Sequence, residues 1–283
     1  MKRLLSLLPF VVVAAFACSP NETPIPERDP YETESQFTLP CLPNLDGQIV
    51  SQEAAPSFGA TASYLVSPLG ATRSIDLEGQ DNGDGTRLWD FSTDDASDQA
   101  IRLGPEPIAG KWFASAFNNP AAFSTPLDAA GRNQNILAID ENSLKLLGVA
   151  STEENGPSGK TLFVYDPPIE FYKFPLAPGS RYESTGVVRN GVFQNIPYAG
   201  QDTYAVEVDG IGEVRLPDLV ATQVLRVRIT VTVAPAAGVA TTTQQTSFLT
   251  ECLGEITRAT SQPNETNRNF SEASEVRRLG LFP

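Results

Sequence analysis

The chain has 283 residues, a formal charge of −14 at neutral pH and no histidine. Its length suits one large β-domain or two smaller ones, and its acidity argues against binding nucleic acid or docking on anionic lipid through charge. The lack of histidine excludes Ser-His-Asp and Cys-His nucleophiles and imidazole-based zinc sites, but leaves carboxylate-only chemistry such as glycoside hydrolysis open.

The first element along the chain is an apolar N-terminal segment that ends at a cysteine. Met1-Lys2-Arg3 precede an apolar run from Leu4 to Ala17. Basic residues followed by a short apolar run are typical of a secretory signal, and the run is shorter than the roughly 20 residues of a transmembrane helix. In the simplest interpretation the signal is cleaved and Cys18 remains a plain thiol.

The end of this run, Ala15-Phe16-Ala17-Cys18, resembles the lipobox of bacterial lipoproteins, with Phe16 where the family usually has a small residue. The resemblance implies a signal peptide over residues 1–17, cleavage before Cys18, and acyl chains such as palmitate on Cys18 as a membrane anchor. Ser19 stands where an Asp would favour inner-membrane retention. The resemblance therefore implies the outer membrane, on its periplasmic or its surface face.

Residues 18–35 are rich in proline and mixed charges and contain almost no apolar side chains. This composition cannot bury a core, so it predicts a lipidated tether. A single β-rich domain is expected from residue 36 to residue 283, with sub-sheets over 36–150 and 160–283 as an open alternative.

Cys41 and Cys252 are the remaining cysteines. An exported chain meets an oxidising compartment, so the pair predicts a disulfide that joins the two ends of the domain. In the chain-entropy model such a long loop stabilises the fold by roughly 4 to 5 kcal/mol. Two buried free thiols are the alternative.

Short alternating apolar runs separated by turn residues predict antiparallel strands in the first half of the chain. Two hairpins are expected, and a further strand that Asp166-Pro167-Pro168 would stop. An irregular excursion is expected over residues 118–132. The strands, in order, are Ser74–Glu78 with Arg87–Phe91, Ile136–Ile139 with Leu144–Ala150, and Thr161–Tyr165.

The loop of the first hairpin imitates part of a calcium site. Asn82 and Asp84 fall on the third and fifth positions of a calcium-binding loop, but Gln80 and Phe91 occupy the first and twelfth. A plain hairpin turn is the favoured interpretation, and Asn82 and Asp84 remain a weak metal candidate. The nearby Asp94, Asp95 and Asp98 are expected to be solvated loop residues rather than a catalytic acid pair.

The second half contains the clearest strand, Gln223–Val233. Leu225, Val227, Ile229, Val231 and Val233 predict a buried face, and the alternating Arg226, Arg228, Thr230 and Thr232 predict a wet one. A hairpin is expected upstream, between Tyr204–Val208 and Glu213–Leu216 around Asp209–Gly212, and Thr241–Cys252 predicts another strand. A helix is a weak expectation at Ser271–Leu279.

Three motifs in order resemble a loose group of exported β-rich proteins of Gram-negative bacteria. They are Leu88–Ser92, Phe174–Gly179, and Gly212–Pro217 leading into Val224–Val227. The resemblance covers residues 60–255 and implies no biochemical activity. The long meander is also similar, at the level of fold alone, to the half-open barrel of the lipoprotein-localisation carriers.

We therefore expect a mainly β fold, an antiparallel meander that forms a large curved sheet or open half-barrel with few short helices. The expected function is a non-enzymatic envelope lipoprotein, a binding or structural module. Its partners would be the membrane, through the lipid anchor, and an apolar ligand or an envelope protein on the concave face. No cofactor and no nucleic-acid partner are expected. The alternative is a carboxylate-based hydrolase of envelope polysaccharide.

Overall fold

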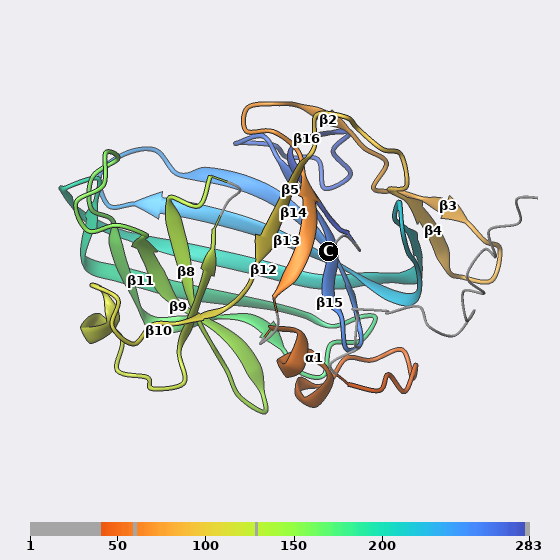
Figure 1. Ribbon diagram of the computed structural model, residues 1–283, viewed down its shortest axis with the longest axis horizontal. Helices are drawn as coiled ribbons and strands as arrows, with labels where there is room; N and C mark the ends of the chain where they lie inside the picture. Colours follow the sequence, from red (N-terminus) through yellow and green to blue (C-terminus); the bar gives the residue numbers. More distant parts are fainter. Residues whose placement is uncertain (1–40, 59–60, 128–129, 281–283) are drawn as a thin grey trace, which may run out of the picture. The chain divides into compact units, whose positions relative to one another are not determined.

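A computed structural model of the chain describes residues 41–58, 61–127 and 130–280, and these residues form one mainly antiparallel sheet with very few helices (Figure 1). The sheet is not closed into a barrel. The fold class expected from the sequence is confirmed. No helix in the described part of the chain is long and apolar enough to cross a membrane.

The described elements are short near the N-terminal end and long in the middle. The first half contains α1 (Ser51–Phe58), β1 (Ala62–Val66), β2 (Arg73–Ser74), β3 (Gln80–Asp81), β4 (Arg87–Asp90), β5 (Gln99–Leu103), β6 (Glu106–Pro107), the 3-10 turn Ala114–Ala116, β7 (Phe123–Pro126), β8 (Asn133–Ile139) and β9 (Ser143–Ser151). The second half contains β10 (Leu162–Lys173), β11 (Arg181–Phe193), β12 (Ile196–Arg215), β13 (Val220–Pro235), β14 (Thr241–Thr250), β15 (Gly254–Ser261) and β16 (Glu272–Leu279).

The strands from β6 to β16 follow one another across the sheet in chain order, which makes a long meander. The order continues from β16 to β1 and β5. The two edge strands, β5 and β6, are separated in the chain by Gly104 and Pro105 alone. The sheet must therefore curl until its two edges come within one short connection of each other, and Figure 1 shows the long strands β11, β12 and β13 as curved ribbons.

The hairpin expected around Asp209–Gly212 is wrong. One strand, β12, runs through this segment and stays paired with β13, with register shifts between Val208 and Gly210 and between Gly212 and Val214. Bulges of this kind bend a strand without ending it. At Gly212 a Cβ atom would lie 1.8 Å from the Arg87 carbonyl oxygen, because β4 pairs with β12 there in parallel. A side chain would not fit at this position, so glycine allows the two backbones to approach each other closely.

Two of the other local predictions are confirmed, and three are wrong in whole or in part. The hairpin of β8 and β9 is confirmed, as is the β13 strand. Asp166-Pro167-Pro168 does not stop its strand, because β10 continues past a register shift between Val164 and Ile169. The segment expected as a helix, Ser271–Leu279, forms β16 instead, because it pairs with β15 on one side and β1 on the other. Ser74–Glu78 is extended only at its start, and β3 takes its place opposite β4.

The described residues form three hydrophobic clusters, of which two lie on opposite faces of the sheet and the third packs Phe113 and Phe117 against β8 and β9. The inner cluster joins residues of β8–β14, such as Ile169, Val206 and Val227. The outer cluster lies over β13–β16 and includes Trp89 and Phe248, whose ring centroids are 5.0 Å apart. Trp89 is fully buried, so the Leu88–Ser92 motif contributes to the packing of this cluster.

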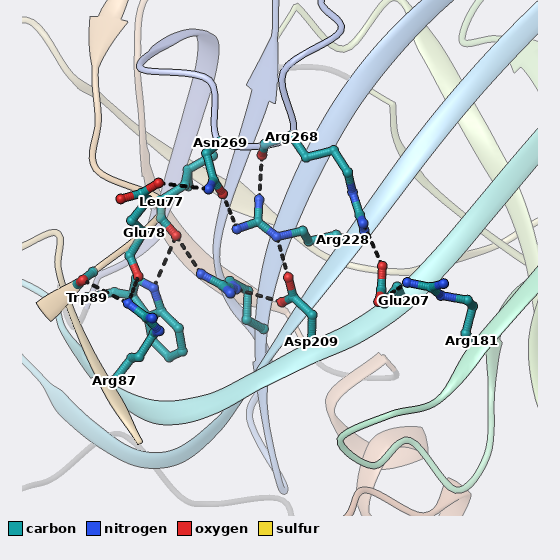
Figure 2. Close-up of polar contacts among 12 residues, drawn as sticks. Leu77, Glu78, Arg87, Trp89, Arg181, Glu207, Asp209, Arg228, Arg268 and Asn269 are labelled. Carbon is teal, nitrogen blue, oxygen red and sulfur yellow. Dashed lines mark hydrogen bonds and ion pairs between the residues drawn. The ribbon is translucent and has the colours of Figure 1, made fainter. Parts of the chain in front are cut away.

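Two arginines on the outer face of β13 tie distant segments to the sheet (Figure 2). Asp209 accepts hydrogen bonds from Arg226 Nε at 2.7 Å and from Arg228 Nε at 2.6 Å. Arg226 also donates to the Leu77 carbonyl at 2.6 Å, and Arg228 donates to the Arg268 carbonyl and to Asn269. The arginine face of β13 was expected to be wet, but Arg226 and Arg228 are only 7% and 4% exposed.

The helix α1 was not expected from the sequence. Glu53 caps it by accepting the Val50 backbone N–H at 3.0 Å, which leaves one fewer unpaired donor at the first turn. Asn44 donates to the same carboxylate at 2.9 Å. The helix is thus fixed to the segment that carries Cys41.

Candidate ligand-binding cavity

The inner face of the sheet encloses a cavity of about 740 Å³. Alternate residues of neighbouring strands form its wall, as on β12 and β13, where Asp202 pairs with Val233 and Tyr204 with Val231. Further lining residues come from β1, from β7–β10 and from β14–β16. The volume lies within the range of small-molecule sites and far exceeds the voids of ordinary protein interiors.

Aromatic side chains make up much of the wall. Phe163, Phe171 and Tyr172 come from β10 and Tyr204 from β12. The rings of Phe171 and Tyr172 are 4.6 Å apart, and those of Phe171 and Tyr204 are 5.8 Å apart. Contacts at these separations fix the rings against one another and give the cavity a stiff apolar surface.

The rim of the cavity carries exposed apolar side chains. Leu69, Leu127 and Phe193 line the cavity and are 69%, 37% and 44% exposed. These three residues therefore continue the apolar lining from the interior to solvent. An apolar ligand would keep contact with such side chains as it enters.

Asp202 is the buried acid on the β12 wall. It is 5% exposed, and its Oδ2 accepts the Tyr165 hydroxyl at 2.5 Å. Within the described residues its Oδ1 has no hydrogen-bond partner. Burial raises the pKa of Asp202, and the hydrogen bond from Tyr165 opposes this rise only in part.

A second set of polar residues on the wall, from β15 and β16, forms ion pairs among its own members. Arg277 Nε lies 2.6 Å from Glu275, and Arg258 lies 3.4 Å from Glu275 and 3.6 Å from Glu255. Glu255 also accepts the Ser247 hydroxyl at 2.8 Å. Burial acts to lower the pKa of Arg258, but the two glutamates outweigh it and the pKa is raised. Both glutamates therefore contact arginine side chains across β15 and β16.

The candidate disulfide, metal and acidic residues from the sequence that the structure describes do not line this cavity. Cys41 and Cys252 form the expected disulfide, with their Cα atoms 5.2 Å apart and 211 positions between them in sequence. The Glu251 carboxylate reinforces this junction by accepting the backbone N–H of Asn44 at 2.6 Å and of Leu45 at 2.8 Å. Cys18 and the proposed tether lie outside the described residues.

The weak metal candidates serve the turn between β3 and β4. Asp84 Oδ1 accepts the backbone N–H and the hydroxyl of Thr86 at 2.9 and 2.6 Å, and the Asn82 amide donates to the Thr86 hydroxyl at 3.0 Å. Over the described ranges, no group of three or more Asp, Glu or Cys side chains is placed to hold a metal ion.

The acidic cluster after β4 is neutralised by arginine rather than simply solvated. Asp98 pairs with Arg73 at 2.7 Å and with Arg278 at 2.5 Å, and Asp95 also pairs with Arg73. These contacts attach the β4–β5 loop to β2 and β16. They leave this cluster without a free buried acid.

Sequence reasoning missed Asp202 and the paired group of β15 and β16. A signal for Asp202 was present, because it alternates with Tyr204, Val206 and Val208 on one side of a strand. A carboxylate in register with apolar residues indicates a buried charge. No comparable signal marks Arg258 or Glu275, since their strands alternate without a clear apolar face.

No family model, no curated protein and no solved structure matches this chain.

Proposed function

We propose that this protein is a non-enzymatic lipoprotein of the cell envelope that holds an apolar or amphipathic small molecule on the concave face of its sheet. The observation that carries the proposal is the cavity of about 740 Å³, walled by aromatic rings and holding one unpaired buried acid. A stiff apolar cavity with a few fixed polar groups is the common form of a ligand site.

The packing of the wall supports a site that exists before the ligand arrives. Its strands belong to one continuous sheet, and the disulfide attaches the segment before α1 to the turn between β14 and β15. Preformed walls avoid the entropic cost of ordering a site during binding. The exposed Leu69, Leu127 and Phe193 supply an apolar entrance.

A hydrolase with two carboxylates is the second candidate, and Asp202 is the feature that favours it. Its raised pKa suits a general acid. Two-carboxylate hydrolysis needs a partner acid within about 5 to 10 Å. Strand pairing places Glu275 of β16 in register with Val206 of β12, by way of Thr260, Gln245 and Ile229 on the three strands between them. Val206 is four residues from Asp202 along β12. That places the two backbones about 13 Å apart along the strands, and Glu275 already pairs with Arg277.

The membrane anchor of the proposal rests on the N-terminal sequence. The lipobox resemblance at Cys18 implies acyl chains there and a location in the envelope, at the outer membrane. Acyl chains bury about 0.8 kcal/mol per methylene, so several of them hold a protein firmly. The ligand site and the anchor are independent parts of the proposal.

Mass spectrometry of the full chain, extracted from the membranes of the cells that make it, tests both parts. The intact denatured mass should correspond to a chain that begins at Cys18 and carries acyl groups. An unmodified Cys18 would refute the anchor. Under native conditions the folded chain should retain a small molecule at about one copy per protein.

A matched pair of variants locates the retained molecule. Val233 lines the cavity, and the adjacent Thr232 lies on the opposite side of β13. Val233→Trp should narrow the cavity beside Asp202 and weaken retention, whereas Thr232→Trp should leave retention unchanged. Equal retention in the two variants, or none in the unaltered protein, would refute the ligand-binding function.

A further inference from the structure

Asp202 is the charged group of the cavity wall that has no basic partner within the described residues. The charged lining residues are Asp202, Glu255, Arg258, Glu275 and Arg277. The two glutamates and the two arginines pair with one another. Their charges cancel, so the wall carries one negative charge in excess, at Asp202.

Tyrosine side chains lie near this carboxylate, and the hydroxyl of Tyr165 donates to it. Burial raises the pKa of Tyr165, Tyr198 and Tyr204, and the nearby charge of Asp202 raises the pKa of each further. Phe163 extends this group because it stacks on Tyr198 with 4.4 Å between ring centroids. The negative faces of aromatic rings attract organic cations, most strongly where water is excluded.

Two neighbouring oxygen atoms lack hydrogen-bond partners. Among the described residues neither Asp202 Oδ1 nor the Tyr198 hydroxyl has one, and both atoms are buried. Tyr198 precedes Asp202 by four residues on the same side of β12. Its side chain lies over the intervening Gly200, with the hydroxyl 2.5 Å from where a Cβ atom of that glycine would be. A buried carboxylate oxygen without a donor is costly, and an N–H group of a ligand would satisfy it.

We propose that the ligand is an amphipathic amine, whose protonated nitrogen binds Asp202 among the rings of Tyr165, Tyr204 and Phe163 and whose apolar part fills the rest of the cavity. This inference rests on the proposed ligand-binding function and names its ligand class. The ammonium group supplies the missing positive charge and donates to Asp202 Oδ1. A neutral alcohol would supply a donor but no charge, and a carboxylate would add to the excess negative charge.

Isothermal titration calorimetry with three eight-carbon probes tests the proposal on the full chain. The probes are octylammonium, octanol and octanoate, which share an apolar chain and differ in the charge of the head group. Octylammonium should bind at least about tenfold more tightly than the other two, as expected for a hydrogen bond to a charged group. Asp202→Asn should remove this preference, because asparagine keeps the shape and an acceptor for Tyr165 but not the charge.

Two internal controls accompany this variant. Octanol affinity should be the same in Asp202→Asn as in the unaltered protein, which verifies that the cavity is intact. Asp218→Asn makes the same chemical change at an exposed turn between β12 and β13 and should keep the full preference. All titrations use the same detergent. The effect of Asp202→Asn is read separately for each probe as the ratio of its affinities for the two proteins, in which partitioning of that probe cancels.

The other outcomes separate this inference from the function on which it rests. Equal binding of all three probes, or an octylammonium preference that survives Asp202→Asn, would overturn the amine proposal and leave ligand binding in place. A preference for octanoate would overturn it too and would point to Arg258 and Arg277. Failure of all three probes to bind would overturn both.

Discussion

At position 202 a carboxylate occupies a place where the inner side of β12 otherwise carries tyrosine and valine. Tyr204, Val206 and Val208 continue the same side toward the inner cluster. Burial of a carboxylate without a basic partner costs free energy, which is reflected in its raised pKa. Such a residue does not stabilise the fold, and the ligand that we propose would offset this cost by supplying a donor to Asp202.

This cost predicts how stability depends on pH in the ligand-free protein. Because the pKa of Asp202 is raised above the ordinary value of 3.8, the folded chain keeps this proton at pH values where the unfolded chain has lost it. The unfolding free energy contributed by this group therefore falls as pH rises from the ordinary pKa through the raised one, and stays low above it.

Asp202→Asn should remove that fall. The variant should be more stable than the unaltered protein near neutral pH, with a higher urea midpoint, and the advantage should shrink as pH approaches the ordinary pKa of the carboxyl group. Urea unfolding over a series of pH values measures the difference. Asp218→Asn, exposed to solvent, should show no such trend. A variant that is less stable at neutral pH would contradict a buried, unpaired charge.

At the scale of elements, the alternation in β13 identified two faces correctly and assigned one of them wrongly. Arg226 and Arg228 face away from the cavity but are covered by the segments around Leu77 and Asn269. Trp89 contributes as well, since the Arg226 guanidinium lies 5.1 Å from its ring centroid. Polar side chains therefore mark the outer face here without being exposed to water.

Asp209 is the carboxylate on which this arrangement depends, and the arginine side chains that it pairs are only 8% and 5% exposed. Asp209→Asn should lower the unfolding free energy by about 3 kcal/mol, because it leaves two buried guanidinium groups without an anion. Urea denaturation measures the loss. Glu213→Gln is the matched control, since Glu213 lies on the same strand and pairs with the exposed Arg215 at 3.0 Å.

The control variant should change the unfolding free energy by less than about 0.5 kcal/mol. If Asp209→Asn lowered the unfolding free energy as little as Glu213→Gln does, the outer arginines would be solvated rather than buried. The Asp209 variant should also loosen the β3–β4 hairpin, and faster amide hydrogen exchange in residues 77–90 would report this.

At the scale of the whole described region, the disulfide between Cys41 and Cys252 links the segment before α1 to the middle of the curled sheet. The bridge spans 211 positions in sequence. It fixes the segment that leads into α1 against the turn between β14 and β15, where Glu251 accepts two backbone N–H groups of the same segment. The constraint acts mainly on the unfolded chain, whose ends it holds together.

The double variant Cys41→Ala with Cys252→Ala should therefore lose about 5 kcal/mol of unfolding free energy in the chain-entropy model. Equilibrium unfolding in urea measures this loss. Addition of a reductant should bring the unaltered protein to the stability of the variant and leave the variant unchanged. A loss below about 1 kcal/mol would contradict the chain-entropy account of this disulfide.

Sequence by itself determined the class of the fold, the β8–β9 hairpin, the β13 strand and the pairing of Cys41 with Cys252. Each of these follows from local alternation, turn residues or the number of cysteines, which need no knowledge of distant segments. The tertiary structure decided that residues 209–212 continue a strand, that Ser271–Leu279 is extended, and that Arg226 and Asp202 are buried. These features depend on partners far away in the chain, because alternation assigns side chains to two faces but does not say what covers either face.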